Sequence, residues 1–263
     1  MLKSLYTAAT GMKAQQVYID AISNNLANVN TNGFKRSQPT FQDLLYVTLK
    51  GAGLDVADGT PNPVGIQIGS GVKLAGTTMN FQAGVLEGTQ RSLDVAITGD
   101  GFFKVLLANG TEAFTRDGHF QLDANGRLVS VSGHPLQPEI VIPQDTIGIG
   151  IGTNGEVTVQ QAASPDVTTT LGRLQLTRFI NPAGLEKQGN NLYLRTSAAG
   201  TGVEAPPGSS GIGSLQQSFL ERSNVEVVSE LVSLIVAQRA YEVNSRAIKA
   251  SDEMLTQATT ILR

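Results

Sequence analysis

Residues 150–155 have the glycine spacing of a dinucleotide-binding loop. They read Gly-Ile-Gly-Thr-Asn-Gly, and in such a loop the pyrophosphate is held at the N-terminus of the helix that follows. Here residues 156–160 follow, and they alternate between polar and apolar types as a strand does. Because no helix is predicted there, we interpret the glycine-rich segment as the turn of a β-hairpin.

Four carboxylates are the other candidates for chemistry. Asp94, Asp100, Glu112 and Asp117 lie near one another in the sequence, and two of them could form the acid and nucleophile pair of a glycoside hydrolase on a β scaffold. Scattered surface acids would give the same pattern. A secreted β-scaffold enzyme acting on polysaccharide therefore stays an alternative that needs two carboxylates converging in a cleft.

The sequence contains few of the residue types that bind metals or cofactors. The chain contains no cysteine and only two histidines, His119 and His134, so a thiolate zinc site or a cysteine nucleophile is excluded. Neither histidine belongs to a pair with helical spacing. We expect no catalytic residue, no cofactor and no metal ion.

Composition narrows the class of protein further. The 263 residues carry a formal net charge of −3 and only 16% charged residues, which does not fit the basic stripe of a nucleic-acid-binding protein. The N-terminus lacks the continuous apolar stretch of a cleavable signal peptide, and no run is long enough to span a membrane. We expect neither nucleic-acid binding nor direct membrane insertion, and export, if any, without cleavage.

Both ends of the chain have the spacing of long helices. Residues 2–28 contain one glycine and no proline, and residues 214–263 contain neither. In each segment apolar side chains recur at alternating steps of four and three, which places them on one helix face. We predict that these seams form subunit interfaces, at Leu5, Met12, Ile19, Leu26, Val227, Leu231, Leu234, Tyr241, Ile248, Leu255 and Leu262.

The C-terminal segment has a second apolar stripe, which includes Val243, Ala247 and Met254. Two stripes require more than one neighbour, and a monomer offers only the N-terminal helix. Polymerisation would cover the remaining surface. A two-helix stalk packed on the central part of the chain would explain it as well, and the stripes alone leave both interpretations open.

The middle of the chain is β-patterned. Short alternating runs are separated by Asn-Gly or Asp-Gly pairs at residues 109–110, 117–118, 125–126 and 154–155, which are typical of hairpins. The fold class is therefore α+β: two long terminal helices form a coiled-coil-like core, and an all-β antiparallel sandwich or open barrel is inserted between them. We expect an N-terminal helix and connector over residues 1–45, an extended arm over 46–71, a β domain over 72–213 and a C-terminal helix over 214–263.

Residues 24–36 contain a motif, Asn-Asn-Leu-Ala-Asn-Val-Asn-Thr-Asn-Gly-Phe-Lys-Arg. The asparagines can end a helix, the glycine permits a turn, and the Lys-Arg pair is expected to keep the exit solvated. The motif resembles the N-terminal signature of flagellar rod and hook proteins. The residues that carry this resemblance are Asn25, Ala27, Asn28, Thr31, Gly33, Phe34 and Lys35.

Three further stretches resemble the same family in the expected order, at residues 94–103, 114–128 and 221–242. Within the family the resemblance is closest to subunits of the distal rod. Residues 46–69 resemble an insertion that is specific to those subunits. A proximal rod or hook subunit is the nearer alternative.

The resemblance implies a structural subunit that is exported through the flagellar type III apparatus and assembles as a homopolymer. The rigid helical tube would cross the periplasm, with terminal helices inside and β domains outside, and would transmit torque from motor to hook. The implied partners are the proximal rod proteins, the hook protein and the surrounding ring proteins.

Overall fold

A computed structural model describes residues 2–51, 64–162, 164–209 and 211–261. The chain divides into two compact units. The first combines residues 1–26, 37–78 and 226–263, and the second combines residues 27–36 and 79–225. Each unit is therefore discontinuous in sequence.

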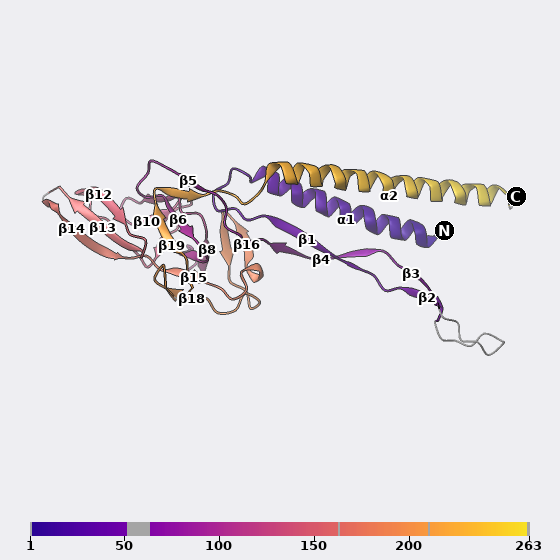
Figure 1. Cartoon of the computed structure of the whole chain (residues 1–263), viewed down its shortest axis with the longest axis horizontal. Helices are drawn as coiled ribbons and strands as arrows, with labels where there is room; N and C mark the ends of the chain where they lie inside the picture. The colour runs from indigo at the N-terminus through magenta and orange to yellow at the C-terminus, as the bar shows by residue number, and fades with distance from the viewer. Residues whose placement is uncertain (1, 52–63, 163, 210, 262–263) are drawn as a thin grey trace. The chain divides into compact units, whose positions relative to one another are not determined.

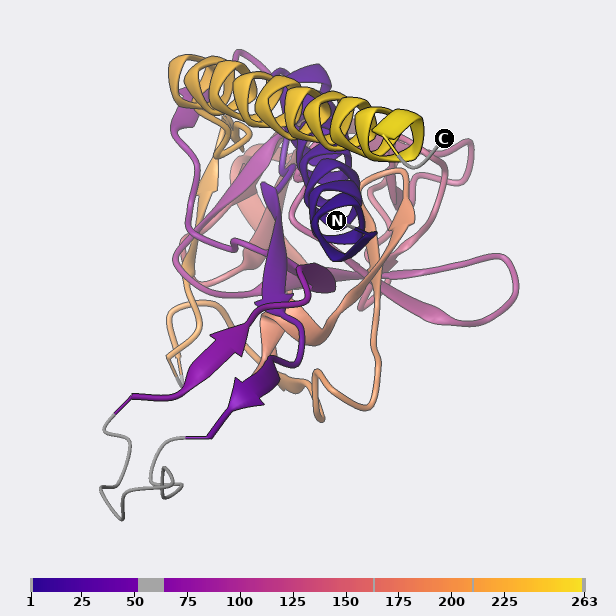
Figure 2. The ribbon, with the colours of Figure 1, turned by 90° about the vertical axis from the view of Figure 1, so that its right-hand side faces the viewer.

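The first unit contains the two helices. Helix α1 spans Leu2–Ala27 and α2 spans Val227–Ile261, so their lengths are about 40 and 50 Å. They run side by side in opposite directions (Figure 1), and α2 crosses over α1 when the unit is viewed from its end (Figure 2). The terminal helices and the antiparallel strands between them confirm the predicted α+β class.

The same unit contains a long two-stranded ribbon. The chain runs outward through β1 (Ser37–Asp43) and β2 (Val47–Lys50), and it returns through β3 (Ile66–Ile68) and β4 (Val72–Met79). Strand β1 pairs with β4, and β2 pairs with β3. The ribbon thus starts before the predicted arm and ends after it. Residues 52–63 of that arm lie outside the described residues.

The second unit is built from short strands. In chain order they are β5 (Leu86–Gly88), β6 (Val95–Thr98), β7 (Phe102–Leu106), β8 (Glu112–Thr115), β9 (Phe120–Leu122), β10 (Leu128–Ser130), β11 (Leu136–Gln137), β12 (Thr146–Ile151), β13 (Glu156–Gln161), β14 (Ser164–Arg173), β15 (Leu176–Arg178), β16 (Glu186–Gly189), β17 (Leu192–Leu194), β18 (Val203–Ala205), β19 (Ser214–Gln217) and β20 (Phe219–Glu221). A short 3₁₀ helix, η1 (Pro182–Gly184), precedes β16.

The largest sheet has the strand order β16-β17-β8-β7-β15-β18, with β11 also on β7, and a second sheet has the order β12-β13-β14. Two-stranded ladders join β9 to β10, β6 to β19 and β5 to β20. Phe103 and Phe120 stack edge to face, with ring centroids 5.0 Å apart, at the centre of the apolar core. This packing of short alternating strands is what buries the core.

Three of the four predicted hairpin turns are confirmed. Gly110, Gly126 and Gly155 have φ angles between +77° and +81° and connect paired antiparallel strands. The last of these ends the glycine-rich segment 150–155, whose residues 152–155 join β12 to β13, and a strand follows it. The prediction for residues 117–118 is wrong, because Gly118 instead accepts a hydrogen bond from the backbone of Val95.

The predicted start of the C-terminal helix at residue 214 is also wrong. Residues 214–221 form β19 and β20, and α2 begins at Val227. Leu215 and Leu220 are buried in the second unit, and the side-chain amide of Gln217 bonds to the backbone of Ile151 and Ile149 along β12. The absence of glycine and proline is compatible with a helix here, but pairing with distant strands makes these residues strands instead.

Candidate functional site

A buried ion pair joins the N-terminal motif to the end of the second unit. The Nζ atom of Lys35 lies 2.6 Å from Oε1 of Glu221, and neither side chain is exposed to solvent. Lys35 also donates to the carbonyl of Gln82 at 2.7 Å, and Glu221 Oε1 accepts from the backbone N–H of Gly84 at 2.9 Å. The expectation that Lys35 keeps the chain exit solvated is therefore wrong.

Arg116 completes this network. Its Nε atom lies 3.0 Å from Oε2 of Glu221, and its Nη1 donates to the carbonyls of Gly99 and Gly101 at 2.8 and 2.7 Å. One carboxylate is thus shared by two buried cations, each of which also donates to backbone carbonyls. Such a site satisfies the rule that buried charges be both paired and hydrogen-bonded.

The electrostatics of the network follow from burial and proximity. Burial would raise the pKa of Glu221, but Arg116, Lys35 and the hydrogen bonds together hold it below its usual value. Burial, reinforced by Arg116, lowers the pKa of Lys35 even though Glu221 opposes the shift. The two cations thus favour the charged form of the Glu221 carboxylate, whereas burial works against the charged form of Lys35.

The neighbours of Lys35 are also fixed. The backbone N–H of Gly33 donates to the carbonyl of Glu221 at 2.8 Å, and that of Arg36 donates to the Asn224 side chain, also at 2.8 Å. Lys187 lies over the Phe34 ring, 4.4 Å from its centroid, and donates to the carbonyl of Lys35. The segment after α1 and the segment before α2 are therefore bonded to each other by both backbone and side chains.

Asn25 plays a comparable part in the first unit. Its side-chain amide accepts from the N–H of Ser37 at 3.0 Å and donates to the carbonyl of the same residue at 2.9 Å, as a paired strand would. It also lies 3.4 Å from Oε2 of Glu230 in the first turn of α2. Asn25 thus connects the end of α1, the start of β1 and the start of α2.

The other motif residues end α1. Thr31 donates to the carbonyl of Asn28 through its backbone N–H and to the Asn28 side chain through its hydroxyl. Gly33 has a φ of +67°, which favours glycine. Ala27 is exposed, and we find no contact that explains its place in the motif.

Helices α1 and α2 meet along one regular line. Ser4 contacts Ser251, Gly11 lies against Asn244, and Asn25 reaches Glu230. In each of these pairs the two residue numbers add up to 255, so the antiparallel register is constant over the length of α1. These three contacts are made by small or polar side chains.

The predicted seam residues lie beside this line. Leu5, Met12 and Leu26 each follow a contact residue by one position, which is about 100° around a helix, and with Ile19 they are half-buried. On α2, Leu234, Ile248 and Leu255 are half-buried, whereas Val227, Leu231 and Tyr241 are 40–43% exposed. Leu262 lies outside the described residues.

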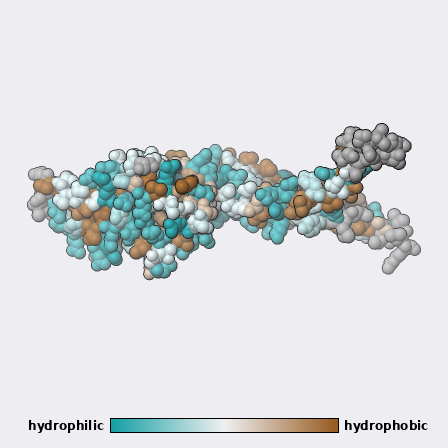
Figure 3. Space-filling model, turned by 90° about the horizontal axis from the view of Figure 1, so that it is seen from below, coloured by the Kyte–Doolittle hydropathy of each residue, from teal (hydrophilic) through white to brown (hydrophobic). Residues whose placement is uncertain are grey.

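Other large apolar side chains of the first unit are more exposed still. Figure 3 shows hydrophobic residues on the surface of this unit among hydrophilic ones. Those on α2 with 50–68% exposure are Val228, Val232, Ile235, Val236, Val243 and Met254, and those on the ribbon and next to it with 42–89% are Leu45, Tyr46, Val47, Leu49, Val64, Ile66, Ile68 and Leu74. The unit leaves uncovered the kind of surface that marks a protein interface.

The candidate catalytic carboxylates do not converge in a cleft. Asp94 is buried with its Oδ1 3.0 Å from Nδ1 of His119, and Asp117 accepts from the backbone of His119 and from Asn191. Glu112 lies on the surface beside Lys104. Burial raises the pKa of Asp117, but its carboxylate is occupied by these donors.

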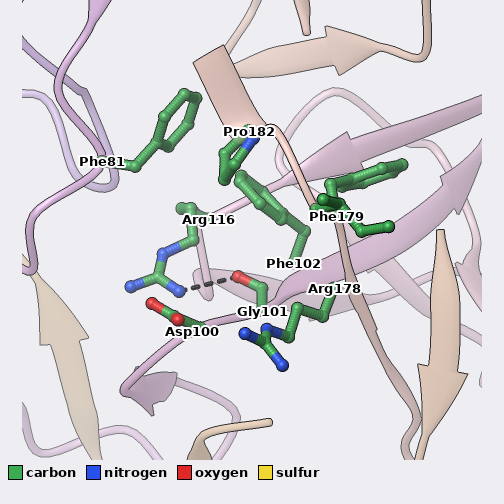
Figure 4. Close-up of a pocket in the computed structure, with 9 residues that line it drawn as sticks. Phe81, Asp100, Gly101, Phe102, Arg116, Arg178, Phe179 and Pro182 are labelled. Atoms are coloured by element: carbon green, nitrogen blue, oxygen red, sulfur yellow. Dashed lines mark hydrogen bonds between the residues drawn. The ribbon is translucent and has the colours of Figure 1, made fainter. Parts of the chain in front are cut away.

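Asp100 lines a small cavity of about 110 Å³ together with Arg116, Arg178 and three phenylalanines (Figure 4). This volume is well below the roughly 300–1,000 Å³ of typical ligand sites. Among the described residues no group of three or more acidic or histidine side chains could hold a metal ion, and no described helix has the length and apolar character needed to cross a membrane.

Sequence reasoning missed Glu221 as the partner of Lys35, and Arg116 as the second cation on the same carboxylate. Both lie in stretches that resemble the family, Arg116 in residues 114–128 and Glu221 at the start of residues 221–242. In each stretch a charged residue stands beside apolar residues with strand-like alternation. This pattern could have suggested a buried pair, but only the tertiary structure shows which charges meet.

Family models match three parts of the chain. They match at residues 5–35 (flagella basal body rod protein), 96–159 (flagellar hook protein FlgE/F/G D1 domain) and 216–261 (flagellar basal body rod FlgEFG protein C-terminal). Lys35, Arg116 and Glu221 each fall within a different one of these three matches.

Several curated proteins resemble this chain over its full length. The flagellar basal-body rod protein FlgG of Buchnera aphidicola from Schizaphis graminum is 47% identical over 99% of this chain and 100% of its own length. FlgG of Borreliella burgdorferi is 46% identical, and FlgG of Bacillus subtilis 40%, each over the whole of both chains. The chain belongs to the flagellar basal-body rod protein family, as a structural subunit of the distal-rod type and not an enzyme.

Proposed function

We propose that this chain polymerises with its own copies into a rigid helical tube that passes torque from the motor to the hook across the periplasm. The observation that carries the proposal is the offset between two lines on the helices. The line through Ser4, Gly11 and Asn25 on α1 is used within the subunit, while the α1 part of the predicted seam lies one position away. That seam and the exposed valines of α2 would be covered by other subunits.

Burial of this surface would supply the drive for assembly, at about 25 cal/mol per Å² of apolar area. Contacts between different surfaces of successive copies do not close into a ring and therefore generate a helix. In such a tube the terminal helices would form the coiled-coil-like inner core. Torque would pass through many contacts in parallel, and no catalytic group would be required.

The buried network supports the same role. A subunit under torque has to keep the segments next to its two helices in one fixed relation, and the bonds among Lys35, Arg116 and Glu221 hold those segments together. The expected partners of the tube are the proximal rod proteins, the hook protein and the surrounding rings. The export apparatus would deliver the subunit without a cleaved signal peptide.

Electron microscopy of the concentrated protein tests the proposal, beside a variant that ends at Ser251. The intact chain should form straight tubes. The shortened chain should not, although the circular dichroism of its β-sheet should be retained. Tubes from the shortened chain would overturn assembly through the helix ends, and curved polymers from the intact chain would contradict the straight distal rod.

A further inference from the structure

The two helices of the first unit differ in reach. Because the numbers of contacting residues add up to 255, Leu2 at the start of α1 is level with Glu253 on α2. Residues 254–261 of α2 therefore extend beyond α1 by about 12 Å. We call residues 252–261, which are this extension and the two residues at its base, the overhang.

The overhang is acidic at its base and carries apolar side chains among polar ones beyond it. Asp252 and Glu253 are exposed and have no ion-pair partner among the described residues. Met254 is 50% exposed, and Leu255 and Ala258 are half-buried. A helix end of this composition gains stability when another surface covers its apolar residues.

A groove elsewhere in the same unit has the complementary character. It has a volume of about 460 Å³ and lies between α1 and the ribbon. Its apolar wall includes Tyr6 and Val17 from α1, and Leu44, Val72 and Leu74 from the ribbon. The volume is large enough to accept several aliphatic side chains, and an unbranched methionine adapts well to such a space.

Lysines provide the charge of the groove. Lys13 and Lys73 both line it, no carboxylate does, and both lysines are exposed. Neither has an ion-pair partner in the part of the chain that the structure describes. The groove thus offers two unpaired cations around an apolar floor, and the overhang offers two unpaired carboxylates next to Met254.

We infer that the overhang of one copy binds in the groove of a second copy, with Asp252 and Glu253 near Lys13 and Lys73. The inference rests on the proposed function and names one of its interfaces. Both surfaces belong to every subunit, so each copy can bind one neighbour through its overhang and another through its groove. A contact of this kind is heterologous and extends without limit.

Cysteine trapping tests the contact directly, because the chain contains no cysteine of its own. Chains carrying Lys73→Cys are mixed with chains carrying Glu253→Cys and oxidised mildly, and mixed dimers are counted on a non-reducing gel. The matched control mixes Lys73→Cys with Arg195→Cys, an exposed position in the second unit. The groove–overhang pair should give at least about tenfold more mixed dimer than the control, equivalent to about 1.4 kcal/mol of preference.

Charge exchange provides a second measurement. The double variants Lys13→Glu with Lys73→Glu, and Asp252→Lys with Glu253→Lys, should each raise the critical concentration for polymerisation on the order of tenfold. A chain with all four substitutions should restore it. The control Arg173→Glu with Arg195→Glu makes the same change in net charge as the lysine double variant, on exposed residues of the second unit, and should have little effect.

The outcomes separate this inference from the proposed function. Straight tubes without excess trapping, or a fourfold variant no better than either double variant, would overturn the overhang–groove contact and leave the tube intact. Neither tubes nor trapping would overturn both. Excess trapping together with rescue by charge exchange would establish the contact.

Discussion

The carboxylate of Glu221 lies 2.6 Å from the ammonium group of Lys35, although 186 residues separate them in the sequence. Most of the second unit, residues 79–220, is inserted between these two residues together with the ribbon of the first unit. The pair therefore requires that the chain return to the segment after α1. Because the pair is buried, a structure that brought only one of the two residues to this place would leave a buried charge without a partner.

Glu221→Gln should destabilise the second unit by about 3–5 kcal/mol, because it leaves Lys35 and Arg116 buried without a counter-charge. Lys35→Met should cost less, since Arg116 would still balance the carboxylate. Urea unfolding followed by circular dichroism measures both. The matched control is Glu87→Gln, whose partner Arg222 is 3.4 Å away and about half exposed, and it should cost less than about 1 kcal/mol. Equal losses for Glu221 and Glu87 would contradict the buried network.

The lowered pKa of Glu221 predicts how the stability of the protein depends on pH in acid. Because the folded pKa of Glu221 lies below its ordinary value of 4.5, its contribution to stability is fully present above pH 4.5. That contribution is lost as the pH falls through the lowered pKa. The urea midpoint of the native chain should therefore drop more steeply below pH 4.5 than that of Glu221→Gln. Parallel curves for the two proteins would rule out the shift.

Asp117 should act in the opposite direction. Burial raises its folded pKa above the ordinary value of 3.8, so the folded state holds a proton more tightly and this group adds stability as the pH falls through the raised pKa. Asp117→Asn removes that contribution and should make the acid-induced loss steeper than in the native chain. The same series of urea midpoints measures it, and a shallower loss would contradict the direction.

Gly33 tests whether the turn after α1 needs a glycine. An added Cβ would lie 2.7 Å from the backbone N of Asp117 and 2.8 Å from the backbone C of Arg116, at a φ of +67°. Gly33→Ala should therefore combine backbone strain of about 1–3 kcal/mol with a steric clash. Gly110→Ala is the control, since its φ is +80° but nothing lies within 4 Å. If the two variants lost the same stability, strain alone would account for Gly33.

The helices show how far sequence reasoning reached. Their spacing predicted both elements, and α1 ends within one residue of the expected position, because apolar periodicity is a local property. The start of α2 was placed too early, since Leu215 and Leu220 are apolar residues compatible with either structure. Their strand conformation depends on β6 and β5, which no local pattern encodes.

The candidate site shows the opposite balance. The motif residues were recognised, but Lys35 was expected in solvent because a Lys-Arg pair after a turn is usually exposed. Its burial depends on Glu221 and Gln82, which are distant in sequence. The residues through which α1 contacts α2 were not predicted either. On α1 this line runs through Ser4, Gly11 and Asn25, because the strongest apolar stripe need not be the one that faces the nearest helix.

The exposed valines of α2 test that last point. Val232 and Val236 are 56% and 61% exposed, and serine has nearly the same helix propensity as valine. The double variant Val232→Ser, Val236→Ser should therefore change the stability of the monomer by no more than about 0.5 kcal/mol. Polymerisation should weaken by at least about tenfold, because each valine contributes on the order of 1.5–3 kcal/mol when it is fully buried.

Ala237 is the matched position on the same helix, because it is only 1% exposed and lies on the side of α2 that is covered within the subunit. Ala237→Leu should overpack that side and destabilise the monomer by about 1–3 kcal/mol. Helix circular dichroism against urea gives the stability, and sedimentation of polymer gives the assembly. If the serine variant sediments as the native chain does, these valines lie outside every contact between subunits, and the apolar drive must come from the seam residues and the ribbon instead.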